Sequence, residues 1–225
     1  DIDEKAFVTA TAANTKVFLD GSNTPIFTLN AGETQSLSLD NAATLYITSD
    51  KPIYTWHVSG FGCEQGGAIL PTVNCRGSQQ IGFTRSNADF FGMNLLVRAG
   101  GETEFVLNGD ANVVNPQSFK DVPGTGGEWL YAQLKFNSTT FIPAGQGSLI
   151  TNNTNSFQMG IINGDRTSAT RFGYFSNFSG LFIGDDASIC EGESYRLDAG
   201  INHSSYLWSD GSTGQFLTAS ASGQY

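Results

Sequence analysis

Short runs of alternating apolar and polar residues recur along the chain, each bounded by Gly, Asn, Asp or Pro. A period of two residues places successive side chains on opposite faces of a β-strand, and no long window has a helical period. The pattern therefore predicts strands joined by tight turns. The predicted strands cover residues 15–19, 34–39, 44–48, 53–58, 80–84, 94–99, 104–107, 129–136, 148–151 and 157–162.

The spacing of these runs predicts an all-β fold. Short strands separated by frequent turn signals are typical of antiparallel sandwiches or barrel-like sheets, which need no crossover helices. The composition agrees, because 17 Phe, 7 Tyr and 3 Trp supply core side chains and 27 Gly supply turns. We expect an antiparallel β-sandwich or barrel-like module over residues 1–185.

Two pairs of segments in this module are weakly similar in sequence, and we call this similarity the sequence echo. The matched segments are TKVFLDG (15–21) with TEFVLNG (103–109), and IYTWHVSG (53–60) with FQMGIING (157–164). Their order is kept, which predicts two similar β halves, residues 1–100 and 101–185. Chance similarity between hairpins is the alternative, and the pattern leaves open whether the halves share one core.

A boundary is expected near residues 184–187, where the phenylalanine-rich pattern stops. Residues 186–225 contain three or four short predicted strands and stop within one of them. They are expected to form a sandwich that is cut before its final strands. Half a sandwich exposes an edge and an open core, which makes it unstable alone. The natural protein is therefore expected to continue beyond Tyr225.

Charge limits the classes of partner. Eleven basic and 21 acidic residues give a net charge of −10, which repels nucleic acid and anionic bilayers. No stretch approaches the roughly 20 apolar residues that a membrane helix needs, and the first residues lack signal-peptide features. The sequence predicts a secreted chain whose leader has been removed.

Three cysteines are present. Cys63 and Cys75 flank a segment with Gly and Pro that allows the chain to double back, which predicts a disulfide; two unpaired thiols are the alternative. Closing this short loop would contribute about 3 kcal/mol of stability. Cys190 is then the odd cysteine, either free or paired outside this chain.

Catalytic chemistry has little support in the sequence. The two histidines are His57, which alternates along a predicted strand, and His203, which lies in a turn. No nucleophile elbow, zinc-protease motif or phosphate-binding loop is present. Acidic residues in loops would hydrolyse glycosides only if two of them converged. We expect no enzyme activity, with a glycan-active enzyme as the least favoured alternative.

Oxygen-rich turns are the candidates for a metal ion. They begin at Asp20, Asn108, Asp185 and Asp210 and offer the ligand type that calcium prefers. The same turns are ordinary hairpin formers. The structural calcium site, if present, is assigned to Asp185 and Asp186 at the module junction; no other cofactor is expected.

Adjacent aromatic pairs are the candidates for a contact surface. Most aromatic side chains of a sandwich belong to its core. Phe90 with Phe91, and Tyr174 with Phe175, are neighbours in sequence, so a strand would point one member of each pair outward. These four residues are the predicted contact surface.

The runs TLYITSDKPIYTWHVSGFGCEQGGAILP (44–71) and FVTATAANTKVFLDG (7–21) resemble the IgGFc-binding-protein N-terminal-like family, with Ala12 and Ala13 where Glu and Asp are usual. Together with DVPGTGGEW and RFGYFSNF, the resemblance covers residues 6–183. Residues 189–225 are similar to the PKD-like, immunoglobulin-type repeats of large surface proteins from gliding and related Bacteroidetes. In those repeats a cysteine near the start pairs with one near the end, which implies an external partner for Cys190.

The resemblance implies an extracellular or cell-surface protein of strung β modules, exported by the type IX route, with no reaction attached. The leading prediction is an adhesin-type binding or display module that contacts an extracellular protein or glycan. The alternative is a structural spacer or filament-forming unit that contacts only itself or neighbouring modules. A binding module predicts an exposed aromatic or calcium-centred patch, and a spacer predicts neither.

Overall fold

The computed structural model describes residues 4–39, 42–61, 64–74, 77–165, 170–175, 192–199 and 205–221 of the 225-residue chain. Within them the regular structure is β-strand, apart from the single 3₁₀ turn η1 (Pro116–Ser118). The strands are β1 (Lys5–Ala10), β2 (Thr15–Leu19), β3 (Phe27–Leu29), β4 (Thr34–Ser38), β5 (Ile47–Ser49), β6 (Ile53–Phe61), β7 (Glu64–Leu70), β8 (Gln80–Thr84), β9 (Phe91–Arg98), β10 (Phe105–Leu107), β11 (Lys120–Asp121), β12 (Trp129–Phe136), β13 (Gly147–Asn152), β14 (Phe157–Asn163), β15 (Arg171–Phe175), β16 (Tyr195–Asp198) and β17 (Phe216–Ala219).

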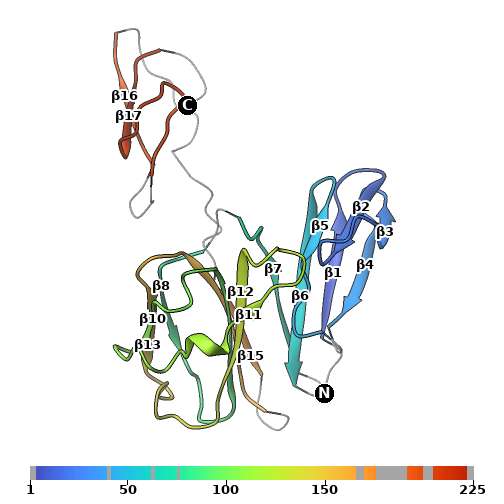
Figure 1. Ribbon diagram of the computed structural model, residues 1–225, viewed down its shortest axis with the longest axis vertical. Coiled ribbons are helices and arrows are strands. Elements are labelled where there is room, and N and C mark those ends of the chain that lie inside the picture. Colours follow the sequence, from blue (N-terminus) through green and yellow to red (C-terminus); the bar gives the residue numbers. More distant parts are fainter. Residues whose placement is uncertain are drawn as a thin grey trace. The chain divides into compact units, whose positions relative to one another are not determined.

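The prediction of an all-β, antiparallel sandwich architecture is confirmed. The chain divides into two compact units, Asp1–Phe178 and Ser179–Tyr225, close to the boundary expected at residues 185 and 186. The larger unit contains β1 to β15 (Figure 1). Because its buried side chains form two separate clusters, we call β1 to β7 the first sandwich and β8 to β15 the second sandwich.

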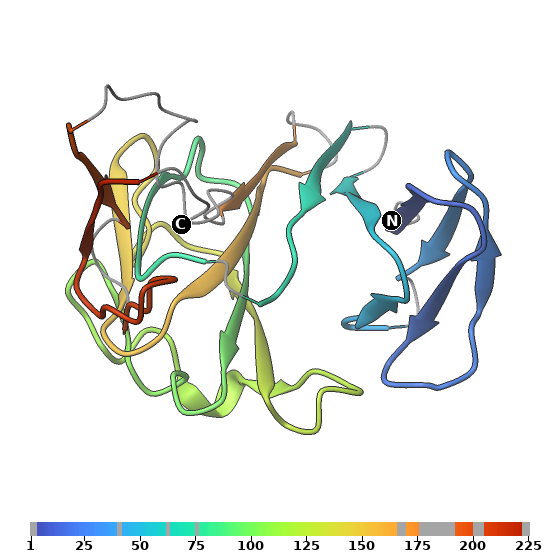
Figure 2. The ribbon, with the colours of Figure 1, turned by 90° about the horizontal axis from the view of Figure 1, so that it is seen from above.

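The first sandwich pairs the sheet β4-β1-β6-β7 with the sheet β3-β2-β5. Along β1 the side chains of Ala6, Val8 and Ala10 are buried, while Phe7 and Thr9 between them point to the opposite face. Figure 2 shows these strands, blue to cyan, grouped around a common interior. The core of the first sandwich consists of Ala6, Val8, Ala10, Val17, Leu29 and Leu37.

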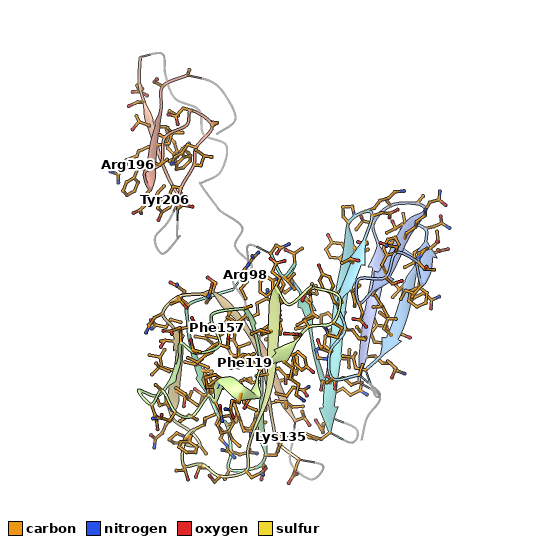
Figure 3. The ribbon with its side chains drawn as sticks, in the orientation of Figure 1. Arg98, Phe119, Lys135, Phe157, Arg196 and Tyr206 are labelled. Atoms are coloured by element: carbon orange, nitrogen blue, oxygen red, sulfur yellow. The ribbon has the colours of Figure 1, made fainter. Side chains whose placement is uncertain are left out.

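The second sandwich pairs the sheet β11-β12-β9-β14-β15 with the sheet β10-β13-β8. Its core is larger and more aromatic than that of the first. The ring of Phe105 stacks on Phe119 with centroids 5.4 Å apart, and meets Phe157 edge-on at 5.0 Å (Figure 3). Large aromatic side chains of this kind bury the most apolar area per residue, so they dominate the stability of this core.

The two sandwiches repeat one strand order. The sheet order β4-β1-β6-β7 returns as β12-β9-β14-β15, and the neighbouring pair β2-β5 returns as β10-β13. The matched hairpin turns agree in conformation, because Asp20 and Asn108 both have φ of 50°, and each is followed by a glycine with positive φ. The sequence echo therefore marks equivalent strands in a repeated topology.

The expected division of the halves at residues 100 and 101 is wrong. A cut there would fall just after β9, whose partners β12 and β14 both lie later in the chain. The division instead falls in the link between β7 and β8. The echo located equivalent strands, but it carried no information on which strand begins the second half.

Glycines make close contacts between the sandwiches. A side chain on Gly124 would bring its Cβ to 2.1 Å from the backbone carbon of Asp20, and both Gly124 and Gly21 have positive φ. A Cβ on Gly66 of β7 would lie 2.5 Å from the Cβ of Phe172 of β15. The backbones approach so closely at these positions that only glycine fits.

The smaller unit is described by the hairpin β16–β17 and its flanks. The indole Nε1 of Trp208 donates to the carbonyl of Gly214 at 2.7 Å, and the guanidinium of Arg196 lies 4.2 Å from the ring centroid of Phe216. The buried cluster of this unit consists of Leu197, Ala199, Trp208, Leu217 and Ala219.

Candidate functional site

The face of β4-β1-β6-β7 that points away from the first core carries exposed aromatic and aliphatic side chains. We call it the outer sheet face, defined by Phe7, Tyr54, Trp56 and Ile69. Strand pairing sets Trp56 of β6 directly between Phe7 of β1 and Ile69 of β7. Directly opposed side chains on one face of a sheet lie in contact range, so the three form a continuous cross-strand row.

Three of the four side chains of the outer sheet face are open to solvent to an unusual degree, while Phe7 is half-buried. Tyr54 is 62% exposed, Trp56 43% and Ile69 48%. Single exposed apolar residues are ordinary, but a row of them on adjacent strands is a feature that needs an explanation. The outer sheet face is therefore the strongest candidate for a contact surface among the described residues.

Gly67 provides the room for the Trp56 indole. A Cβ at Gly67 would lie 2.8 Å from the indole Nε1 and 3.0 Å from Cε2, so the ring rests against the backbone of β7. A larger residue at position 67 would push the indole out of this place. The glycine thus fixes the position of the largest side chain of the face before any partner binds.

Hydroxyl groups border the apolar row. Thr9 lies opposite Tyr54 on β6 and opposite Thr34 on β4, and the two threonine hydroxyls are 2.8 Å apart. Ser36 of β4 lies opposite Phe7. An apolar centre with a polar, solvent-accessible border is the usual anatomy of a protein contact surface.

The predicted contact surface of adjacent aromatic pairs is only partly available. Phe91 is fully buried and its ring lies 5.8 Å from that of Phe83, so its inclusion in a surface is wrong. Phe90 points the other way, as alternation requires, but its ring meets Phe61 edge-on at 5.6 Å. The Phe61 ring therefore covers part of Phe90.

The pair on β15 is likewise held against the protein. Phe175 packs on the second core. The Tyr174 hydroxyl donates to Oε1 of Gln158 at 2.5 Å, and burial raises the pKa of this phenol above its ordinary value. A contact role for Phe90, Tyr174 or Phe175 stays a prediction.

The remaining predicted site residues lie outside the described part of the chain. They are Cys63, Cys75, Asp185, Asp186 and Cys190. The disulfide, the calcium site and the external partner of Cys190 therefore stay predictions. Among the residues that the structure describes, no group of three or more His, Cys, Asp or Glu side chains is placed to hold a metal ion.

His57 and two of the acidic loop residues, Glu102 and Glu128, have local partners, whereas His203 lies outside the described part of the chain. His57 Nε2 lies 2.7 Å from Oε1 of Glu4, and the imidazole meets the Phe172 ring edge-on at 5.8 Å. Glu128 pairs with Arg98 at 2.7 Å, and Glu102 accepts a bond from the backbone nitrogen of Gly100. These contacts hold turns and the joint between the sandwiches.

A buried arginine organises the loops at one end of the second sandwich. Arg85 is 0% exposed, and desolvation lowers the pKa of its guanidinium while the charge of Asp89 opposes that shift. The buried amide of Asn163 fixes the same loop, since its Oδ1 accepts from the backbone nitrogens of Ser86 and Asn87. The guanidinium donates to the backbone carbonyls of Asn87, Ala88, Asp89, Phe136, Ser138 and Ile142.

Sequence reasoning missed both the outer sheet face and Arg85. Alternation places Tyr54 and Trp56 on one face of β6, but it does not say which face meets the core. Arg85 comes directly after β8, where an exposed charged residue is ordinary. Only the backbone carbonyls around its guanidinium show that it is buried. The usable signal was Gly67, the glycine that interrupts β7 beside the tryptophan.

Two joined sandwiches with an exposed apolar sheet face define an all-β module. The IgGFc binding protein family matches residues 3–162, which is more than half of the chain. The chain belongs to the IgGFc binding protein family, which is of extracellular type, as the sequence resemblance predicted. No curated protein and no solved structure matched. Within the described residues, the structure contains no helix of the length and apolar character that crossing a membrane requires.

Proposed function

We propose that this chain is a non-enzymatic, adhesin-type binding module of a cell-surface protein, and that its outer sheet face contacts a protein partner. The observation that carries the proposal is the exposure of Tyr54, Trp56 and Ile69 on the outer sheet face, two of them in its cross-strand row. Covering a large apolar side chain contributes about 1.5 to 3 kcal/mol, which gives this row a strong tendency to be covered.

The residue types of the row also favour a protein partner. Tyr and Trp are enriched among the residues that dominate protein binding energy, where neighbouring polar groups exclude water. A flat sheet face suits a broad protein surface better than a small ligand, which needs a concave site. The net charge of −10 favours a partner that is neutral or basic around the contact.

The family description names the Fc region of immunoglobulin G, so an Fc fragment is one partner to test. Type IX export, a Bacteroidetes source and the PKD-like tail belong to the same proposal and rest on sequence resemblance alone, whereas calcium dependence rests on the oxygen-rich turn at Asp185 and Asp186. The rival function is a structural spacer or filament unit, which would leave the outer sheet face without a soluble partner.

The test is a binding assay with the immobilised chain against purified extracellular proteins, an Fc fragment included. Trp56→Ala is expected to weaken saturable binding about 30-fold or more, as for a residue at the centre of an interface. Phe141→Ala is the matched control, because Phe141 is a 47% exposed aromatic on the second sandwich. Equal affinities of both variants would refute the proposed surface, and no saturable binding would favour the spacer.

A further inference from the structure

A cleft of about 370 Å³ lies on the first sandwich, away from the outer sheet face. It opens between the turn that follows β2 and the end of β5. Its volume falls near the lower end of the range for sites that hold small molecules. The residues that line it are Phe18, Gly21, Ser22, Asn23, Thr48, Ser49 and Asp50.

The wall of the cleft combines one aromatic ring with hydroxyl groups. Val17 faces the core, so Phe18 points to the opposite face of its sheet, where strand pairing places Thr48 directly beside it. The two side chains form a half-buried pair. A ring of this kind presents an apolar surface on which the C–H face of a ligand can rest.

Asp50 and Asn23 have capacity for a ligand, and Asp50 is also held in place by the protein. Oδ1 of Asp50 accepts from the backbone nitrogen of Lys16 at 2.8 Å, which leaves Oδ2 without a partner among the described residues. The amide of Asn23 offers both donors and an acceptor, and likewise has no partner there. Gly21 is fixed by the close approach of Gly124, so the turn is ordered before a ligand arrives.

The lining selects a ligand by its chemistry. Within the described residues it has one carboxylate, one amide, three hydroxyls and no cationic side chain. The hydroxyls of Ser22 and Ser49 donate to the carbonyls of Thr24 and Lys51, which leaves their oxygens to accept from a ligand. An anion would be repelled by Asp50. A polyhydroxyl ligand matches this mixture of donors and acceptors, since each hydroxyl can both donate and accept. We infer that the cleft is a second binding site, independent of the proposed protein contact, that takes a neutral saccharide unit.

The experiment is an amide chemical-shift titration of the full 225-residue chain with glucose, galactose, mannose and N-acetylglucosamine, each raised to tens of millimolar. The inference predicts that at least one sugar shifts the amides of Phe18, Asn23, Thr48 and Asp50 in a saturable way. Titration with agmatine, a cationic probe, tests the other ligand that a carboxylate beside a ring could hold.

Two variants sharpen the result. Asn23→Ala is expected to weaken sugar binding about fivefold, the value of one lost hydrogen bond, and Asp50→Asn about tenfold. Asp50→Asn keeps an acceptor for the Lys16 nitrogen, so it should still fold. Asn137→Ala, which removes an exposed loop asparagine elsewhere, should leave sugar binding unchanged.

Three outcomes of the titrations would overturn the inference. They are no shift with any sugar, shifts that lie outside the cleft, and saturation by agmatine alone. Loss of binding in Asn137→Ala as large as in Asn23→Ala would overturn it too. Because Trp56 is not part of the cleft, Trp56→Ala should retain sugar binding, which separates failure here from failure of the proposed protein contact.

Discussion

The two sandwiches share a strand order but use the same face of the sheet differently. In the first, Tyr54 and Trp56 are exposed. The sequence echo places Gln158 and Gly160 at the equivalent positions of the second, and both are buried. Ile69, which pairs with Trp56, corresponds to Tyr174, which pairs with Gly160.

The difference has a structural cause. The link after β7 lies against the second face, where Gln158 donates to the carbonyl of Thr72 at 3.3 Å, and Gly66 packs on Phe172. The first face has no such cover among the described residues. The same sheet face is thus an internal packing surface in the second sandwich and an open apolar surface in the first. The covered face has Gly160 where the open face has Trp56.

The largest expected effect is a loss of stability that is confined to the second sandwich. Arg85→Met removes the donors of six backbone carbonyls at the end of the second sandwich. Unsatisfied buried acceptors each carry a desolvation cost, so we expect a loss of about 3 kcal/mol or more in the free energy of unfolding. Chemical denaturation measures the loss, and hydrogen exchange locates it.

The control for this prediction is Arg98→Met. Arg98 is exposed, pairs with Glu128, donates to Asn74 and lies over the Trp129 ring, and the loss of these contacts should cost about 1 to 2 kcal/mol. Protection of the amides in β9, β12 and β14 should fall in Arg85→Met before that of β1 and β6. Equal loss in both sandwiches would show that they unfold as one cooperative unit and would weaken the comparison.

The joint between the sandwiches gives the next largest effect. Gly124→Ala would force a Cβ against the backbone of Asp20, with an expected cost of about 1 to 3 kcal/mol beyond that of the positive φ alone. Gly126→Ala is the matched control, because Gly126 also has positive φ but has open space around it. Thermal unfolding of both variants isolates the contact, and equal melting temperatures would show that it is not tight.

The smallest expected effect is on the pH dependence of stability, and it comes from Tyr174 on the covered face of the second sandwich. Burial raises the pKa of Tyr174, so the folded protein keeps this phenol protonated where the unfolded chain releases the proton. Stability from this group is full below about pH 10, the ordinary pKa of tyrosine, and falls above it by up to about 1.4 kcal/mol per pH unit. Denaturation between pH 9 and 11 should show a shallower fall in Tyr174→Phe than in the native chain. Parallel curves would mean that the phenol is exposed.

The sequence predicted the strands whose alternation is clean and missed those where glycine or alanine weakens it. β6 and β9 alternate strongly and were expected. β7 contains Gly66 and Gly67, and β1 presents only alanine and valine to its core, so neither stood out. The repeat was visible because hairpin turns need particular residues at positive φ, as at Asn108.

The candidate site was less accessible to sequence reasoning. Whether an aromatic side chain is core or surface depends on what packs over its face, which a single strand does not record. Phe91 and Trp56 illustrate the point, since both alternate along a strand, yet Phe91 is buried in the second core and Trp56 is open to solvent. The cleft beside Phe18 depends on a turn and a strand end that are distant in sequence.

Hydroxyl-radical footprinting tests the central claim most directly, because it reads the solvent access of individual aromatic side chains in the native protein. The account predicts that Tyr54 and Trp56 are modified rapidly in the free chain and become protected when a protein partner binds, while Tyr174 is protected throughout. Rapid modification of Tyr174, or no protection of Trp56 in a saturated complex, would contradict it.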